Sequence, residues 1–364
     1  MDLNQKLDLA RGRPSGFDYM RLVLSVGVVC IHSSLTAYGS DVEMWTSATR
    51  PFVRIILPMF FALSGYLVAG SLLRSTSLLH FLAFRILRIY PALSVEVLLS
   101  AFIIGPVLTH APLAQYFTDP LFRQYLLNVT GDIHYLLPGL FTTNPFPNTV
   151  NAQLWTVPFE LLCYAAIIGL AIIGVRRRRV LAPLSVLVLT VAYTALKVHE
   201  YHGFPPTIIG RVSGLFLLTS FLSGVTLFLY GDRIPWSSRL CVASGVISGA
   251  LVSVVPDGDY IVAPFAAYFT VSLGLMNPRK LGILRGADYS YGIFLYGFVI
   301  QQVLMALLPW ARVWWLNILL SVPCAALVAA ASWHCIEKPA LRLKRLLPVR
   351  TRPDPLATAA PMAQ

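Results

Sequence analysis

Charged residues are scarce in this sequence. They make up 12% of the 364 residues, whereas apolar residues make up 57%, and a soluble domain carries about 25% charge. The mean hydropathy is +0.70. A water-soluble core cannot bury this much apolar surface, but a lipid bilayer can cover it. The composition therefore excludes an ordinary soluble domain and predicts a membrane-spanning chain.

Acidic residues are fewer than basic ones, with 16 Asp and Glu against 28 Lys and Arg. The net charge of +12 does not indicate a nucleic-acid partner, because the basic residues form short clusters between apolar runs rather than one basic face. Such clusters are typical of the cytoplasmic loops of membrane proteins.

Cysteines are few and unpaired, and no C-x-x-C motif occurs. This excludes a disulfide framework. His199-x-x-His202 lacks a convincing third ligand, so no metal site is expected. The G-x-S-x-G motif of serine hydrolases, internal repeats and glycine-rich phosphate loops are also missing.

Apolar runs long enough to cross a bilayer are what the chain has in abundance. We therefore expect an all-α polytopic bundle of about ten transmembrane helices. The expected spans are residues 20–38, 52–72, 81–108, 154–175, 180–198, 209–230, 237–255, 260–276, 289–309 and 313–335. Segment 133–141 is too short to cross, and would be interfacial or re-entrant.

Loop charge predicts the orientation of the bundle. With the N-terminus inside, 22 of the 28 Lys and Arg residues fall on the inner side, so both termini are expected in the cytoplasm. Residues 1–345 would form one transmembrane domain, and the Pro- and Ala-rich residues 346–364 a short disordered cytoplasmic tail. The long outer connection 110–153 is expected to be functional.

Ionisable side chains deep in a bilayer are costly and therefore functional candidates, and the deepest here are His32, Glu96 and Glu160. Arg21 and His32 are eleven residues apart, which places them on one helix face about 16 Å apart. Arg21 could hold a phosphate at the inner surface while His32 waits at mid-depth, which suits the long shape of acyl-CoA. The alternative is a core histidine and an ordinary helix-end arginine.

Two further arginines, Arg85 and Arg88, are three residues apart and should project together at the inner surface. Paired guanidinium groups suit phosphates, although simple anchoring of the helix is the alternative. Glu96 follows Arg85 by eleven residues on the same face. We interpret Glu96 as a structural ion partner, with a second catalytic carboxylate as the alternative.

Glu160 enters the membrane from the outer side and lies about 9 Å below the start of its helix by rise. This depth is comparable to that of His32, so the carboxylate could orient the imidazole and raise its basicity. The alternative is a glutamate bound to backbone left free by Pro158. Ser64 and Gly65 are interpreted as helix-packing residues rather than as a nucleophile site.

Six segments together resemble the bacterial acyltransferase family 3, the membrane acylases of O-antigen, exopolysaccharide, Nod factor and macrolide sugars. Their order and their spread over nearly the whole chain make the resemblance fairly specific. The segments are Asp18-x-x-Arg21 with His32, Phe60-Phe61-x-x-Ser64-Gly65-Tyr66, Arg85-x-x-Arg88-x-Tyr90-Pro91, Leu154-Trp155-Thr156-x-x-x-Glu160, Ser290-Tyr291-Gly292-Ile293-Phe294-Leu295-Tyr296 and Ile336-Glu337-Lys338-Pro339.

The resemblance implies a role for each matching residue. Arg21, Arg85 and Arg88 would bind acyl-CoA at the cytoplasmic side, and His32 would be the essential catalytic residue. The candidate supporting residues are Asp18, Tyr90, Glu96, Asn151 and Trp155. Many members carry a histidine soon after the Ser-Tyr segment, where this chain has Gly297-Phe298, so that role is not carried over.

The resulting hypothesis is an O-acyltransferase of the bacterial inner membrane. It would move an acyl group, with acetyl favoured, from cytoplasmic acyl-CoA to a hydroxyl of a surface or exported glycan or glycolipid. His32 would act as general base, with transient transfer of the acyl group to His32 as the alternative, and Glu160 would orient it or tune its pKa. A macrolide or other small-molecule acylase would use the same residues. The alternative of another class is a transporter or flippase with a His32–Glu160 proton relay, although no internal symmetry is visible.

Overall fold

The computed structural model describes residues 1–40, 49–75, 77–201, 212–254, 259–284 and 286–343. Within these ranges the regular elements are all helical, and the β-structure is one isolated bridge between Asp2 and Pro235. The all-α fold class is therefore confirmed. The predicted tail, residues 346–364, lies outside the described residues, and the division into domain and tail stays a prediction.

The longest connection between consecutive α-helices runs from α7 to α8. In chain order the α-helices are α1 (Leu3–Leu9), α2 (Gly16–Tyr38), α3 (Arg50–Arg74), α4 (Leu78–Leu99), α5 (Gly105–Leu108), α6 (Leu113–Thr118), α7 (Pro120–Leu126), α8 (Val157–Ile173), α9 (Leu181–Tyr201), α10 (Gly214–Leu229), α11 (Ser238–Val254), α12 (Asp259–Gly274), α13 (Ser290–Leu307), α14 (Trp314–Ser332) and α15 (Lys338–Arg342).

Short 3-10 and π-helical elements join several of them. The π-helices are η1 (Ser100–Ile104) and η6 (Trp333–Glu337), and the 3-10 helices are η2 (Leu127–Thr130), η3 (Ala152–Thr156), η4 (Gly282–Leu284) and η5 (Pro309–Ala311).

Six described helical segments are long and apolar enough to cross a membrane. They are Gly16–Tyr38, Pro51–Arg74, Leu78–Leu108, Ala152–Ile173, Ser290–Leu307 and Trp314–Arg342. Four further apolar helices, within α9 to α12, are shorter than this length. Each of the ten segments expected from the sequence thus coincides with a helix, while the count of ten spans and the cytoplasmic location of both termini stay predictions.

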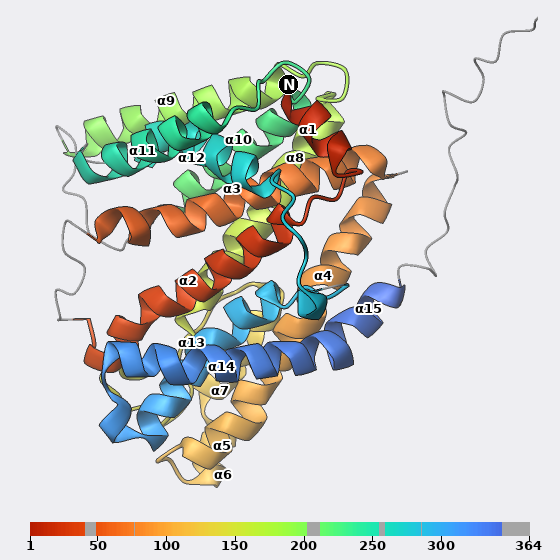
Figure 1. Cartoon of the computed structure of the whole chain (residues 1–364). Coiled ribbons are helices and arrows are strands. Elements are labelled where there is room, and N and C mark those ends of the chain that lie inside the picture. The colour runs from red at the N-terminus through yellow and green to blue at the C-terminus, as the bar shows by residue number, and fades with distance from the viewer. Residues whose placement is uncertain (41–48, 76, 202–211, 255–258, 285, 344–364) are drawn as a thin grey trace, which may run out of the picture.

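Helix α2 lies at the centre of the bundle. It packs against α3 and α12 on one side and against α13 and α14 on the other (Figure 1). Helices α9, α10, α11 and α12 gather with α3, whereas α13 pairs with α14 (Figure 1). A residue on α2 can therefore face side chains from both groups of helices.

Helices α3 and α10 approach each other closely because glycines face the partner backbone. A Cβ atom on Gly65 would lie 1.9 Å from the carbonyl oxygen of Phe221, and one on Gly224 would lie 2.0 Å from that of Ala62. No side chain fits in either place. The interpretation of Gly65 as a helix-packing residue agrees with this geometry.

The connection 110–153 folds back onto the bundle. It contains α6, α7 and η2, and segment 133–141 within it forms no helix. The side-chain nitrogen of Asn144 donates to the backbone carbonyl of Gln302 on α13 at 2.9 Å, and the Gln302 side chain donates to the carbonyl of Phe146 at 2.8 Å. These bonds hold the connection against α13, directly before the chain enters η3 and α8.

Candidate active site

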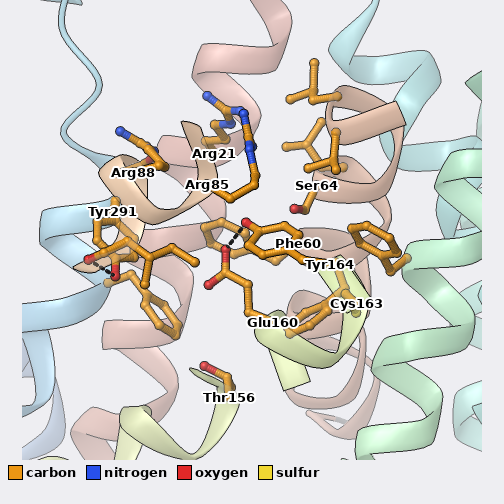
Figure 2. A pocket seen from close by; sticks show the side chains of 18 of the residues that line it. Arg21, Phe60, Ser64, Arg85, Arg88, Thr156, Glu160, Cys163, Tyr164 and Tyr291 are labelled. Carbon is orange, nitrogen blue, oxygen red and sulfur yellow. Dashed lines mark hydrogen bonds between the residues drawn. The ribbon is translucent and has the colours of Figure 1, made fainter. Parts of the chain in front are cut away.

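A cavity of about 110 Å³ lies where α2, α3, α4, α8, α10 and α13 meet. The side of the cavity formed by α3 is mostly apolar, with Ser64 among its lining residues. The charged lining residues come from α2, α4 and α8 (Figure 2). An apolar cavity with a few convergent charged groups is the usual form of a small-molecule site.

Three arginines gather at one end of this cavity. Arg21 comes from α2, and Arg85 and Arg88 come from the N-terminal half of α4 (Figure 2). Glu160 and Thr156 lie successively farther from these guanidinium groups (Figure 2). The structure thus brings together the three arginines that the sequence singled out, on a single cavity.

Beyond the three guanidinium groups the site widens into a more open recess. Arg21, Arg85 and Arg88 also line this recess, together with Arg13, Arg74 and His80. Five arginines around one opening create a positive potential that attracts an anion with several phosphates. We call this opening the arginine recess.

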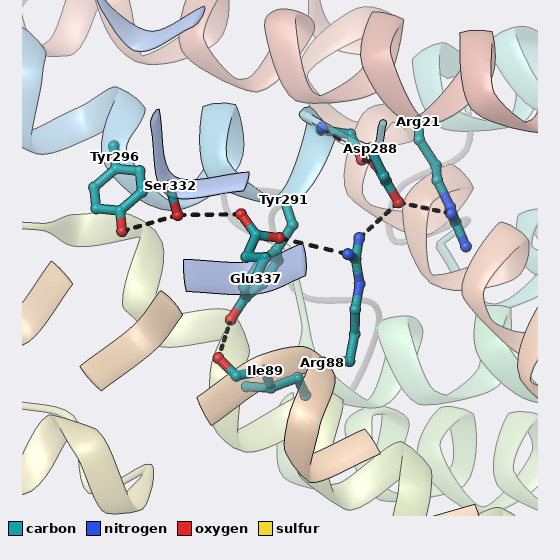
Figure 3. A network of polar contacts seen from close by, with 9 residues as sticks. Arg21, Arg88, Ile89, Asp288, Tyr291, Tyr296, Ser332 and Glu337 are labelled. Atoms are coloured by element: carbon teal, nitrogen blue, oxygen red, sulfur yellow. Dashed lines mark hydrogen bonds and ion pairs between the residues drawn. The ribbon is translucent and has the colours of Figure 1, made fainter. Parts of the chain in front are cut away.

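Asp288 links two of the arginines. Its Oδ2 accepts hydrogen bonds from Arg21 at 2.9 Å and from Arg88 at 2.7 Å (Figure 3). Its other oxygen accepts from the hydroxyl and the backbone N–H of Ser290, the first residue of α13. One carboxylate therefore joins α2, α4 and α13.

The charge state of Asp288 follows from these contacts. Burial by itself would raise the pKa of this carboxyl. The guanidinium groups of Arg88 and Arg21 and the bonds from Ser290 outweigh burial and hold the pKa well below its usual range. Asp288 is therefore ionised throughout the physiological pH range.

Arg88 has a second carboxylate partner, Glu337. The two side chains approach within 3.5 Å, and the other Glu337 oxygen accepts from Ser332 at 3.1 Å (Figure 3). Tyr296 on α13 donates in turn to Ser332 at 3.3 Å. Glu337 lies in the π-helix η6, and π-helical turns occur often at functional sites.

Arg85 differs from its two neighbours because no described carboxylate pairs with it. Its Nη2 lies 3.5 Å from the Ser71 hydroxyl, and its guanidinium lies 5.7 Å and 5.9 Å from the rings of Phe81 and Tyr164. Its Nε is buried without a hydrogen-bond partner. Arg85 is thus the cavity arginine with the most unused donor capacity for an anionic ligand.

Glu160 lines the cavity and is bonded within its own helix. The hydroxyl of Tyr164, one turn later on α8, donates to its Oε1 at 2.6 Å. In the described part of the chain no hydrogen bond joins Glu160 to His32. The expected direct contact between the two is therefore not formed in this structure.

His32 lies on α2 outside the set of residues that line the cavity. Its Nδ1 lies 3.3 Å from the side-chain nitrogen of Gln153, and its ring meets the edge of Phe298 with centroids 5.3 Å apart. Thr156, which does line the cavity, donates to the backbone carbonyl of Gln153 at 3.1 Å. The η3 turn therefore connects the cavity to His32.

Glu96 is fully buried and meets neutral partners. Its Oε1 accepts from Ser100 at 3.1 Å and from Asn151 at 2.9 Å. No described cation forms an ion pair with it, so amide and hydroxyl donors stand where an ion partner was expected. Asn151 also donates to the carbonyl of Leu295 on α13 at 2.9 Å.

The remaining candidate residues lie around this site. Asp18 pairs with Lys280 at the start of α2. Tyr90 packs on the apolar core, and the ring of Trp155 packs on that of Phe159 with centroids 5.7 Å apart. In the residues searched, no group of three or more His, Cys, Asp or Glu side chains could hold a metal ion.

Three residues that matter here were not singled out from the sequence. Asp288 lies just before a segment that carried the resemblance, and Glu337 lies within one but was given no role of its own; an isolated carboxylate at the edge of an apolar run was the signal that could have found them. Gln153 is uncharged and gives no such signal. All three act through contacts between segments distant in sequence.

We predict that Asp288→Asn lowers the thermal stability of the purified protein. Without the carboxylate, the Arg21 and Arg88 guanidinium groups repel each other in a partly buried place and lose charge-assisted hydrogen bonds, which typically costs about 1.5–3 kcal/mol. A thermal unfolding curve in detergent measures the loss.

The matched control is Asp232→Asn, which removes an exposed partner of Arg179 at 3.1 Å. Exposed pairs contribute about 1 kcal/mol or less, so this variant should melt like the wild type. Equal melting temperatures for the two variants would show that Asp288 does not hold the arginine end together.

Comparison with known proteins agrees with the sequence resemblance. A family model described as an acyltransferase domain, that of acyltransferase family 3, matches residues 15–336. An O-acetyl transferase of Shigella phage Sf6 is 26% identical, over 88% of this chain and 94% of its own length. Nodulation protein 10 of Rhizobium leguminosarum bv. viciae is 28% identical, over 93% of this chain and 96% of its own length.

No solved structure matches the chain significantly. The family match covers all the cavity residues described above, from Arg21 to Phe294. The chain therefore belongs to acyltransferase family 3, and its cavity is the candidate active site of an acyltransferase.

Proposed function

We propose that the protein transfers an acetyl group from acetyl-CoA to a hydroxyl of a cell-surface or exported glycan or glycolipid. The arginine recess would bind the phosphates of the donor on the cytoplasmic side of a bacterial inner membrane. The pantetheine arm would extend through the cavity, past Glu160, and bring the thioester toward His32. The acceptor would approach from the opposite side, along the connection 110–153.

The chemistry needs one base at the end of this path opposite the arginine recess. His32 Nε2 would take the proton of the acceptor hydroxyl while its oxygen attacks the thioester carbonyl. The new C–O bond forms, the C–S bond breaks, and the imidazolium returns the proton to the departing CoA thiolate. The reaction is then balanced without a covalent enzyme intermediate or a metal.

The observation that carries this proposal is that the two ends of the cavity differ in charge. Three guanidinium groups stand at one end, and the other end reaches Thr156, whose neighbour Gln153 contacts His32. On the uninterrupted helix α2, Arg21 and His32 are separated by about 16 Å of rise. A donor with a charged head and a reactive tip suits this arrangement.

The relative from Shigella phage Sf6 supports the choice of acetyl donor and hydroxyl acceptor. It is described as an O-acetyl transferase, and the other relative is described as a nodulation protein. Membership in an acyltransferase family favours an enzyme over the transporter or flippase alternative. A macrolide acceptor would use the same donor path. The acceptor is therefore identified by finding which molecule carries the label after transfer from radiolabelled acetyl-CoA.

We expect His32→Ala to abolish acetyl transfer, because the proposed mechanism assigns the proton transfer to this imidazole. Inside-out vesicles that contain the protein would receive radiolabelled acetyl-CoA, and label would be counted in lipid-linked or polymeric glycan. His334→Ala, at an exposed histidine that lines neither the cavity nor the arginine recess, is the matched control and should transfer label normally.

Two results would contradict the proposal. Normal labelling by His32→Ala would remove the histidine from the mechanism. Label that enters an added macrolide but no glycan, with equal vesicle insertion, would assign the acceptor to the alternative class.

We expect Arg85→Ala to raise the KM for acetyl-CoA about tenfold or more and to change kcat little, because a lost phosphate contact weakens ground-state and transition-state binding alike. Initial rates at varied acetyl-CoA would show the split. Arg239→Ala removes an exposed arginine on α11, outside the arginine recess, and should leave KM unchanged. An equal KM in the two variants would assign Arg85 to anchoring of α4.

A further inference from the structure

A continuous series of side-chain contacts leads from Glu96 to His32. Glu96 Oε1 accepts from Asn151 Nδ2 at 2.9 Å, and Asn151 Oδ1 accepts from the backbone N–H of Gln153 at 3.2 Å. The Gln153 side chain then lies 3.3 Å from His32 Nδ1. This series starts on α4, passes through the first turn of η3 and ends on α2.

We propose that Gln153 is a positioning residue that selects the tautomer of His32, and that Asn151 and Glu96 hold Gln153 in register for this role. The inference rests on the proposed function, because it concerns the base that the transfer requires. It assigns a task to three buried polar side chains that do not reach the cavity.

The selection follows from which end of the Gln153 amide faces the ring. If the amide nitrogen faces Nδ1, it donates to the Nδ1 lone pair, and the single ring proton of neutral imidazole must sit on Nε2. Nε2 then cannot accept a proton from a substrate. If the amide oxygen faces Nδ1, it accepts the Nδ1 proton, and the Nε2 lone pair is free to act as base.

The working state that we propose has the amide oxygen toward the ring. The Gln153 amide oxygen is buried and has no hydrogen-bond partner. A half-turn of the amide exchanges oxygen and nitrogen without a change in shape. That half-turn supplies the oxygen with the Nδ1 proton as a partner and stabilises the imidazolium formed during transfer.

Within this series of contacts, hydrogen bonds hold the side chain of Asn151 in place on both sides. It is fully buried, and its side-chain nitrogen is shared between Glu96 and the carbonyl of Leu295 on α13. Its oxygen caps η3 at the N–H of Gln153. Glu96 is held in turn by Ser100 at 3.1 Å. The backbone of Gln153 is therefore held through Asn151 to both α4 and α13, which limits the positions that its side-chain amide can take.

The imidazole has two polar neighbours, the backbone carbonyl of Val28 one turn earlier on α2 and the side chain of Gln153. From α13 the ring meets the apolar edge of Phe298, and from η3 it meets the Gln153 amide. The two carboxylates at similar depth are engaged elsewhere, Glu96 by Asn151 and Glu160 by Tyr164. In the described part of the chain no ion pair is formed with His32.

The test is a comparison of Gln153→Met with Gln153→Glu in acetyl transfer. Methionine fills the space but cannot accept the Nδ1 proton, so kcat should fall at least about tenfold while the KM for acetyl-CoA stays within about twofold. Glutamate keeps an acceptor and adds a charge. It should retain transfer and move the acid limb of the kcat/KM profile up by about 1 pH unit or more, because a carboxylate stabilises the imidazolium.

Gln301→Met is the matched control. Gln301 is as buried as Gln153, and it also reaches α2, where its side chain donates to the carbonyl of Val29 at 2.9 Å. Its loss should lower the melting temperature without a change in the acid limb. If Gln153→Met and Gln301→Met show the same kcat and the same pH profile, Gln153 is only structural and the inference is overturned.

A second pair of variants tests the far end of the series. Glu96→Gln keeps an oxygen for Asn151, so its kcat should stay within about threefold of the wild type, whereas Glu96→Leu should reproduce the kinetic signature of Gln153→Met. Loss of transfer by Glu96→Gln as complete as that of His32→Ala would make the carboxylate itself catalytic, and would overturn its positioning role. Failure of the wild type to transfer label would instead contradict the proposed function.

Discussion

The shared carboxylate of Asp288 is the contact on which the arginine end of the cavity depends. Two guanidinium groups that face each other in a partly buried place would repel, and the low local dielectric would strengthen that repulsion. The Asp288 carboxylate lies between them and attracts both, with its Oδ2 2.9 Å from Arg21 and 2.7 Å from Arg88. Because Arg88 also reaches Glu337, the same small network joins α2, the middle of α4, the start of α13 and η6 around one opening.

The polar groups of the site change in kind along the cavity. Full charges lie at the arginine end, where water and counter-ions can share the cost of desolvation. At the other end of the cavity the polar contacts are made by the hydroxyl of Thr156 and, behind it, by the amides of Gln153 and Asn151. Neutral hydrogen-bonding groups direct a histidine at lower energetic cost than a buried ion pair would. This ordering suits a donor whose charge is confined to its head.

Helix periodicity predicted the parts of the site that lie on one element. It placed Arg85 beside Arg88 on one helix, and both line the cavity from α4. It also placed Arg21 and His32 on a single helix, which is α2. It could not predict which residues face them from elsewhere. Glu160 has about the depth of His32 by rise, but rise gives no direction around the helix axis, and the carboxylate turns to Tyr164 instead. Asp288, 200 residues after Arg88, and the uncharged Gln153 were missed for the same reason.

The glycine contact between α3 and α10 constrains what the cavity can admit. Gly65 touches the backbone of Phe221, and Phe221 and Ser64 both line the cavity. Two backbones already at van der Waals distance cannot move closer, and any slide along the helix axis would drive other residues with a Cβ into the same gap. Room for a bulkier acyl chain must therefore come from shortening side chains such as Phe60 or Phe294, which makes acyl-length selectivity a matter of side-chain volume rather than of helix movement.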